Sequence, residues 1–248
     1  MRVKIENLTK RFDDAVAVDN FNMTFEDGEL VALLGPSGCG KSTLLSLMAG
    51  LEQPTAGQIL LDGDAVSEPT EKVGLMPQKD QLFEWRTIWK NVLLGPEIRR
   101  ENTAETQKEI QSMLNQYALE AFTQKQPAQL SGGMRQRCAL IRTLALSPEV
   151  LLLDEPFSAL DYQTRLTVSD DIAQIIRRTG KTAVLVTHDI SEAISMSDQI
   201  VVLSHRPGSV KSIHDLQEMA DMTPMLRRNH PAFQIMFNTI WEELDVNA

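Results

Sequence analysis

The stretch that most constrains this chain is residues 30–49. There the apolar run LVALL leads directly into the glycine-rich loop GPSGCGKS and then into a helical stretch from Lys41 to Ala49. An unbroken apolar run of strand length is typical of a strand covered on both faces, as in a parallel sheet. The loop, Gly35 to Ser42, matches the pattern G-x4-G-K-[ST] between a strand and a helix, the context that this pattern requires. This order predicts an α/β core with a phosphate-binding loop.

The chemistry of the loop follows from its residue types. Glycines let backbone N–H groups converge on the β- and γ-phosphates at a helix amino terminus, whose partial positive charge adds to the attraction. Lys41 adds a mobile cation, and Ser42 offers a hydroxyl to Mg2+. The alternative is a glycine-rich turn that binds nothing, and the flanking strand and helix argue against it. Cys39 is interpreted as a small loop residue, not a nucleophile, whose alkylation should block the site.

A second apolar run, VLLLDE at residues 150–155, ends in two acids. The carboxyl ends of strands are where ligand sites form in open α/β sheets, so Asp154 should lie beside the phosphate loop and hold Mg2+. Glu155, one residue further, is placed to polarise an attacking water as a general base. The alternative, a strand that ends in an exposed acidic turn, loses weight because the phosphate loop is present.

A third motif, LSGGM at residues 130–134, opens a helix that runs to Leu146. Ser131 and the two glycines after it expose a helix amino terminus with free N–H donors, which makes a second anion site without a lysine. In isolation, the same residues are an ordinary helix start with Ser131 as N-cap.

The periodicity changes along the chain. Alternating apolar and polar residues predict half-buried antiparallel strands in the first thirty positions, whereas Thr87 to Leu146 contains helical spacing, as at Ile110, Met113, Leu114 and Tyr117. Strand-length apolar runs alternate with helices after Pro148, which indicates a largely parallel sheet. We expect one domain, 1–248, with an α/β core and β subdomain from 1–78 and 147–230 and a helical subdomain from 79–146.

The spacing of apolar residues predicts a further amphipathic helix over 231–248. Pro231, a residue favoured in the first turn of a helix, precedes the apolar stripe. This stripe contains Phe233, Met236, Phe237, Ile240, Trp241 and Leu244. The simplest interpretation is a closing helix packed on the domain.

Composition excludes several classes of function. The chain has 24 Lys and Arg residues against 34 Asp and Glu, a net charge of −10, which argues against nonspecific nucleic-acid binding. Its two cysteines, Cys39 and Cys138, have no spacing typical of a disulfide framework or a zinc site. No window approaches the roughly 18 apolar residues of a membrane span, so we expect no direct insertion into a membrane.

Six elements in order resemble those of the ATP-binding subunit of an ABC transporter, over nearly the whole chain. GPSGCGKST resembles the Walker A loop, VLLLDE the Walker B strand and LSGGM the signature motif. Gln78 follows a strand as the Q-loop glutamine does, SALD at 158–161 resembles the D-loop, and TH at 187–188 resembles the switch histidine. The resemblance implies a P-loop NTPase with a RecA-like parallel-sheet core, an antiparallel β subdomain and an inserted α-helical subdomain.

The resemblance also implies roles, with ATP and Mg2+ as the ligands. The implied ATP-binding residues are Phe12, Gly35, Pro36, Ser37, Gly38, Cys39, Gly40, Lys41, Ser42 and Thr43. The implied catalytic residues are Glu155, His188, Gln78 and Lys41, and the implied Mg2+ ligands are Ser42, Gln78 and Asp154. Phe12 would stack on adenine, although it could equally be a core or surface residue. A lone His after a strand, such as His188, is more often structural by composition alone.

Two copies would pack head to tail, so that the signature residues of one chain reach the γ-phosphate bound by the other. These signature residues are Leu130, Ser131, Gly132, Gly133 and Met134, and the D-loop residues are Ser158, Ala159, Leu160 and Asp161. Phe83, Trp85 and Trp89 would receive an integral membrane permease, with burial in the helical subdomain as the alternative.

The implied function is an ATPase that powers solute import at the cytoplasmic face of the inner or plasma membrane, as a peripheral subunit. SHRPG at 204–208 resembles importer ATPases of the nitrate, sulfonate and taurine type, whose relatives serve thiamine-precursor pyrimidines. An extracytoplasmic solute-binding protein would belong to the same system. The alternatives are the ATPase of an exporter, or an ABC-type ATPase without a membrane partner that acts on nucleic acid or the ribosome.

Overall fold

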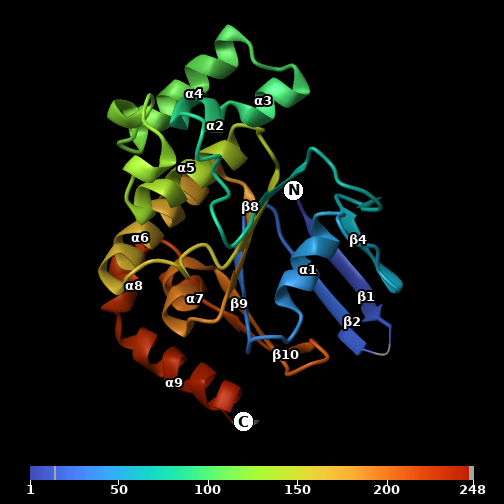
Figure 1. Ribbon diagram of the computed structural model, residues 1–248. Helices are drawn as coiled ribbons and strands as arrows, with labels where there is room; N and C mark the ends of the chain where they lie inside the picture. The colour runs from blue at the N-terminus through green and yellow to red at the C-terminus, as the bar shows by residue number, and fades with distance from the viewer. Residues whose placement is uncertain (14, 246–248) are drawn as a thin grey trace.

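The core of the protein is a six-stranded sheet with the strand order β10-β9-β3-β8-β7-β6. The computed structural model describes residues 1–13 and 15–245 (Figure 1). The strands are β3 (Leu30–Leu34), β6 (Val73–Met76), β7 (Val150–Asp154), β8 (Thr182–Thr187), β9 (Gln199–Leu203) and β10 (Val210–Asp215). The first five pair parallel with one another, as predicted, because helical crossovers connect them.

The edge strand β10 pairs antiparallel with β9 and was missed by the sequence analysis. Its sequence, VKSIHD, alternates between half-buried and exposed positions and contains four polar residues. Only a short edge strand tolerates so little burial, and this composition hides the strand from an apolar-run search.

A second, four-stranded antiparallel sheet has the order β2-β1-β4-β5. Its strands are β1 (Val3–Phe12), β2 (Ala15–Phe25), β4 (Ala56–Leu61) and β5 (Asp64–Ala65). The alternation predicted for the first thirty residues appears here, because Val3, Ile5 and Leu8 face the core shared with β3. Helix α1 (Lys41–Met48) packs between the two sheets in the same cluster.

Between β6 and β7 the chain forms a helical insert, at the top of Figure 1. It comprises α2 (Ile88–Val92), α3 (Leu94–Arg99), α4 (Ala104–Gln116), α5 (Gly132–Leu144) and the 3-10 turns Glu120–Phe122 and Pro127–Gln129. Helix α5 belongs to two cores: Cys138 and Ile141 pack inside the insert, whereas Ala139 and Leu140 pack against the main sheet. The insert is therefore joined to the sheet through one shared helix.

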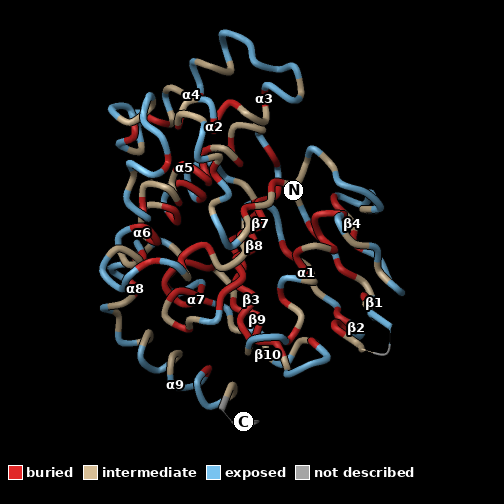
Figure 2. The backbone as a smooth tube through the Cα atoms, in the orientation of Figure 1, coloured by how far each residue is buried: buried red, intermediate tan, exposed pale blue. Residues whose placement is uncertain are grey.

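The remaining helices pack beside the sheet or form the carboxyl-terminal part of the chain. They are α6 (Tyr162–Thr179), α7 (Ile190–Met196), the 3-10 turn Gln217–Met219, α8 (Pro224–Arg228) and α9 (Pro231–Asp245). Figure 2 shows the buried residues concentrated along the central strands, and α9 as mostly exposed or intermediate. Within the helix expected over 231–248, Ile240 is fully buried against β3 and β9, whereas Trp241 is half exposed and stacks on Phe237. Residues 246–248 lie outside the described residues.

Candidate nucleotide-binding site

The phosphate-binding loop lies between the end of β3 and the start of α1. Gly38 and Gly40 have φ angles of +79° and +108°, in the left-handed region that favours glycine. A Cβ atom on Gly40 would lie 2.5 Å from the carbonyl oxygen of Ala17, so only glycine fits there. Gly40, which the motif requires, is thus also required by the backbone path of the loop.

Lys41 lies at the amino terminus of α1 and is only 5% exposed. Its Nζ donates to the carbonyl oxygens of Gly35 and Pro36, at 2.7 and 2.9 Å. Both acceptors are neutral carbonyl oxygens, so neither offers a negative charge to the ammonium. A phosphate oxygen would satisfy the positive charge of Lys41 better than a carbonyl does.

The side chain of Cys39 faces away from the loop opening and into the core. It is 1% exposed, packs in the cluster around β3, and burial raises the pKa of its thiol. The thiol is therefore a poor target for alkylation, contrary to the expectation that alkylation should block the site, because the thiolate is the reactive form.

A hollow of about 280 Å³ opens at the loop. It is lined by Phe12, Ala17, Ser37, Gly38, Gly40, Lys41, Ser42, Thr43, Glu155 and Arg206. Phe12, at the end of β1, is 42% exposed, and the Nζ of Lys10 lies 4.7 Å from its ring centroid. An exposed ring at the mouth of a phosphate site is free to stack on a base.

The sequence analysis missed Ala17 and Arg206, although SHRPG had been singled out for family likeness. Arg206 donates from Nε to the carbonyl oxygen of Val16 at 3.1 Å, and the N–H of Gly208 donates to Ala17 O at 3.0 Å. These bonds fix the 204–208 loop against β2 and bring a cation to the hollow. An arginine in a Pro-Gly loop directly after a parallel strand was the available signal.

Asp154, the last residue of β7, lies opposite the start of α1. Its Oδ1 accepts from the Ser42 hydroxyl at 3.2 Å. Burial raises the pKa of Asp154, despite the hydrogen bond from Ser42. A half-buried carboxylate next to a hydroxyl is a donor set of hard oxygen atoms, which fits Mg2+.

Gln78, Glu155 and His188 converge at the carboxyl ends of β6, β7 and β8. Glu155 Oε2 accepts from Gln78 Nε2 at 3.3 Å and lies 3.2 Å from His188 Nδ1. Glu155 itself has a φ of 42°, in the left-handed region, and its N–H donates to Val186 O on the neighbouring strand. Strain of this kind needs support from the surrounding structure, and here the sheet supplies it.

Residues 158–161 connect Glu155 to α6. Ser158 Oγ donates to Glu155 O at 3.1 Å and accepts from Gln78 Nε2 at 3.3 Å. Asp161 caps α6 by accepting from the Thr164 N–H at 3.0 Å, a bond that lowers the pKa of the Asp161 carboxyl. Leu160 is buried, while Ala159 is exposed.

The LSGGM motif lies elsewhere on the surface. Ser131 caps α5 by accepting from the N–H of Met134, as expected for an N-cap, and Gly133 packs so closely on α6 that a Cβ would lie 2.6 Å from Val168 Cγ2. Leu130 is half-buried and Gly132 is exposed. Ser131 and Gly133 line a hollow of about 920 Å³ with residues of α5, α6 and α8. The tertiary structure thus puts the two motifs that were predicted to bind anions in different hollows of one chain.

The three aromatic residues expected to receive a permease have different surroundings. The rings of Phe83 and Trp85 lie 4.8 Å apart, and Trp85 is 74% exposed. Trp89 is partly buried and packs against the core of the insert. Among residues 1–13 and 15–245, no helix has the length and apolar character needed to span a bilayer.

Comparisons with known proteins agree with this geometry. A family model described as ABC transporter matches residues 18–158. The uncharacterized ABC transporter ATP-binding protein YtlC of Bacillus subtilis is 46% identical over 94% of this chain and 90% of its own length. The taurine import ATP-binding protein TauB of Roseobacter denitrificans is 35% identical over 97% of this chain and 94% of its own. A solved dimeric ATP-binding cassette, bound to ADP and Pi in a post-hydrolysis state, is 32% identical, with a TM-score of 0.73 over 87% of this chain and 99% of that chain.

Proposed function

This chain belongs to the ABC transporter ATP-binding proteins and is an ATPase, and on that premise we propose that it powers solute import as half of a head-to-tail dimer with two composite ATP sites. The observation that carries the proposal is the convergence of Gln78 and His188 on Glu155, next to the Ser42–Asp154 pair. A general base, its two partners and a cation-binding pair then lie along one edge of the sheet.

ATP binding uses the loop and the hollow beside it. Loop N–H groups and Lys41 hold the β- and γ-phosphates, and Phe12 stacks on the base. Ser42, Asp154 and the amide oxygen of Gln78 would hold Mg2+, which supplies charge neutralisation to the phosphates when bound. Gln78 has this oxygen available because its Nε2 is engaged by Glu155 and Ser158.

Hydrolysis uses Glu155 as the general base. Its carboxylate takes the proton of the attacking water, while His188 and Gln78 keep water and carboxylate in register. His188 also reaches the γ-phosphate. These side chains come from three strands of one sheet, so their mutual geometry is fixed by the hydrogen-bond register of β6, β7 and β8.

The dimer accounts for the separate position of the signature motif. Ser131 and Gly133 line a hollow that shares no lining residue with the hollow around Lys41. They therefore complete the site of a second copy instead of their own. The solved dimeric cassette bound to ADP and Pi supports this arrangement. Each ATP then bridges two chains, and hydrolysis releases them.

Import is the direction that the relatives favour, since TauB is named for taurine import. Trp85, which is exposed and packs against the half-buried Phe83, offers an aromatic surface to an integral membrane permease, and an extracytoplasmic binding protein delivers the solute. The solute class is that of the nitrate, sulfonate and taurine group or of thiamine-precursor pyrimidines. The chain works as a peripheral subunit at the cytoplasmic face of the membrane.

Mixing two inactive variants tests the composite site. Lys41→Ala removes the phosphate cation, and Ser131→Arg blocks the exposed signature helix start. Each variant alone should lose ATPase activity, and an equal mixture should recover part of it, because a mixed dimer has one intact site. No recovery on mixing, with an active unmodified chain and two folded variants, would contradict the head-to-tail dimer.

Copurification tests the transport role. The chain should copurify with the membrane permease encoded beside it, and Trp85→Ala should weaken that association. Ile98→Ala, also in the insert and 73% exposed, is the matched control and should not. ATP-dependent binding to DNA or ribosomes, without permease association, would favour the alternative function.

A further inference from the structure

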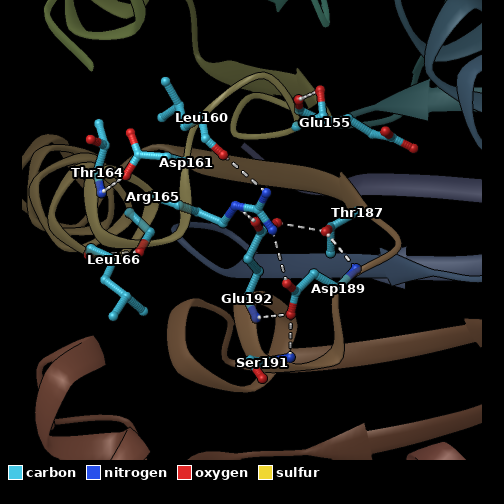
Figure 3. Close-up of polar contacts among 12 residues, drawn as sticks. Glu155, Leu160, Asp161, Thr164, Arg165, Leu166, Thr187, Asp189, Ser191 and Glu192 are labelled. Carbon is cyan, nitrogen blue, oxygen red and sulfur yellow. Dashed lines mark hydrogen bonds and ion pairs between the residues drawn. The ribbon is translucent and has the colours of Figure 1, made fainter. Parts of the chain in front are cut away.

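Arg165, in the first turn of α6, connects the two loops that flank Glu155 and His188. Figure 3 shows its guanidinium between Leu160 and Asp189. One terminal nitrogen, NH2, donates to the carbonyl oxygen of Leu160 at 3.1 Å, and the other, NH1, donates to Asp189 Oδ2 at 3.3 Å. The first acceptor belongs to residues 158–161, and the second directly follows His188. A single side chain thus links these two segments.

The loop that carries His188 is held by its own polar network. Asp189 Oδ1 accepts from the N–H groups of Ser191 and Glu192 at the start of α7, and the Asp189 N–H donates to Thr187 Oγ1 at 3.0 Å. Thr187 Oγ1 donates in turn to Glu192 Oε2 at 2.6 Å. His188 therefore lies between two residues whose positions are fixed together, and a shift of Asp189 moves the whole loop.

The guanidinium is also directed at Glu192. Arg165 Nε is buried, has no hydrogen-bond partner among the described residues, and lies 3.7 Å from Glu192 Oε1. Three nitrogens of one planar group thus face three different acceptors. An ammonium, being a single point charge, does not reproduce this fork.

Residues 158–161 are anchored at their other end to the general base. Ser158 Oγ donates to Glu155 O, and Gln78 donates to the same hydroxyl. The segment therefore contacts Glu155 through Ser158 and the His188 loop through Leu160 and Arg165. A displacement of this segment acts on both members of the Glu155–His188 pair.

We propose that Arg165 is a positioning residue that couples residues 158–161 to the His188 loop, so that the Glu155–His188 pair is aligned only when this segment is in place. The proposal rests on the proposed function, and it adds that residues 158–161 lie at the interface with the second copy. Docking of the second copy then sets the catalytic geometry at a distance from ATP. Arg165 is not among the residues that line the hollow beside Lys41.

The test is Arg165→Lys in the full-length chain, with kcat and KM for ATP measured separately. Lys keeps a cation beside Asp189 and Glu192, so the variant should fold, but it loses the fork to Leu160. We expect kcat to fall about tenfold or more, because small misplacements of reacting groups are costly, and KM to change by less than about twofold. Asp189→Asn keeps the α7 cap acceptor and should give the same loss, and the double variant should lose no more than either single variant.

Arg177→Lys is the matched control. Arg177 also joins α6 to α7, since it donates to the carbonyl oxygen of Met196 at 3.3 Å and pairs with Asp198 at 2.9 Å, but it does so away from Leu160 and Asp189. Its kcat should stay near that of the unmodified chain, even if its thermal stability falls as much as that of Arg165→Lys. Equal kcat values for the two variants would overturn the proposal.

Two further outcomes separate this proposal from the proposed function. In a Glu155→Gln background, Arg165→Lys should still form the ATP-dependent dimer, because both phosphate-binding motifs are intact. Loss of that dimer would show that Arg165 acts on assembly, which also overturns the proposal. If mixing Lys41→Ala with Ser131→Arg restores no activity while Arg165→Lys still lowers kcat selectively, the dimer model fails and the coupling stands.

Discussion

Gln78 Nε2 lies 3.3 Å from Glu155 Oε2, although the two residues are 77 positions apart in the chain. The helical insert departs from the sheet immediately after Gln78, and Glu155 follows the strand onto which the chain returns. The amide therefore connects the base of the insert to the proposed general base. We expect movement of the insert against the sheet to alter this contact, which would then link the proposed permease surface to the proposed hydrolytic site.

Glu155→Gln tests the role of the base. The amide matches the carboxylate in shape, so ATP binding should persist, but it cannot accept the proton of water. We expect kcat to fall at least about 100-fold, with an ATP-bound dimer accumulating in size-exclusion chromatography with light scattering. Glu218→Gln, on an exposed side chain, is the control. Turnover at the rate of the unmodified chain would remove Glu155 from the mechanism.

Gly40→Ala tests the backbone requirement of the phosphate loop. The φ of +108° and the 2.5 Å approach of a Cβ to Ala17 O both force the loop to move. We expect at least about tenfold weaker ATP binding in calorimetry and a stability loss of roughly 1–3 kcal/mol. Gly63 has a similar φ, of +96°, but no atom lies within 4 Å of a Cβ built there. Gly63→Ala should therefore lower stability without weakening ATP binding. Equal ATP affinity in both variants would contradict this account.

Phe12→Ala tests stacking on the base. Removing an exposed ring from the mouth of the hollow should weaken ATP binding about fivefold to tenfold, because stacking contributes roughly 1 kcal/mol. Phe12→Tyr should retain the affinity. Ile235→Ala, which is 69% exposed on α9, should have no effect. If the affinity of Phe12→Ala for inorganic triphosphate falls as much as its affinity for ATP, the ring does not contact the base.

Glu192→Gln tests the buried carboxyl behind the His188 loop. Burial raises the pKa of Glu192 from 4.5 to about 7, opposed by the Thr187 hydrogen bond and by Arg165 and His188, and reinforced by Asp189. The folded chain binds this proton more tightly than the unfolded chain does. The contribution to the free energy of unfolding is therefore complete below pH 4.5 and is lost as the pH rises to about 7, with an upper bound of about 3 kcal/mol.

Urea denaturation between pH 5 and pH 8 measures this contribution. Gln carries no titrating proton, so the unfolding free energy of Glu192→Gln should not show this loss. The difference between the unfolding free energies of Glu192→Gln and the unmodified chain should therefore increase across this range, in favour of the variant, and become constant above pH 7. Glu218→Gln should follow the unmodified chain. Parallel curves for Glu192→Gln and the unmodified chain would show that Glu192 is ionised throughout.

Local chemistry made much of the site predictable. Three features each need a particular backbone within a few residues, so each leaves a short motif in the sequence. They are the glycine loop, the acids at the end of an apolar strand and the serine before two glycines. The parallel sheet was predictable for a similar reason, since strands buried on both faces are continuous apolar runs. The edge strand β10 has one exposed side and was not predictable in this way.

Other features depend on which distant segments meet. The core position of the Cys39 thiol depends on the packing around β3, and the role of Arg206 in the hollow depends on hydrogen bonds to Val16 and from Gly208 to Ala17. Arg165 and Glu192 leave no motif, because a charged residue in a helix has the same local pattern whether it faces solvent or a loop. The sequence by itself determined that this chain has a glycine-rich loop between a strand and a helix, a pair of acids at a strand end and a serine-capped helix start. Only the tertiary structure decided that Gln78, Glu155 and His188 meet while Ser131 lies apart, because strand register and helix packing, which act over long sequence separations, set those distances.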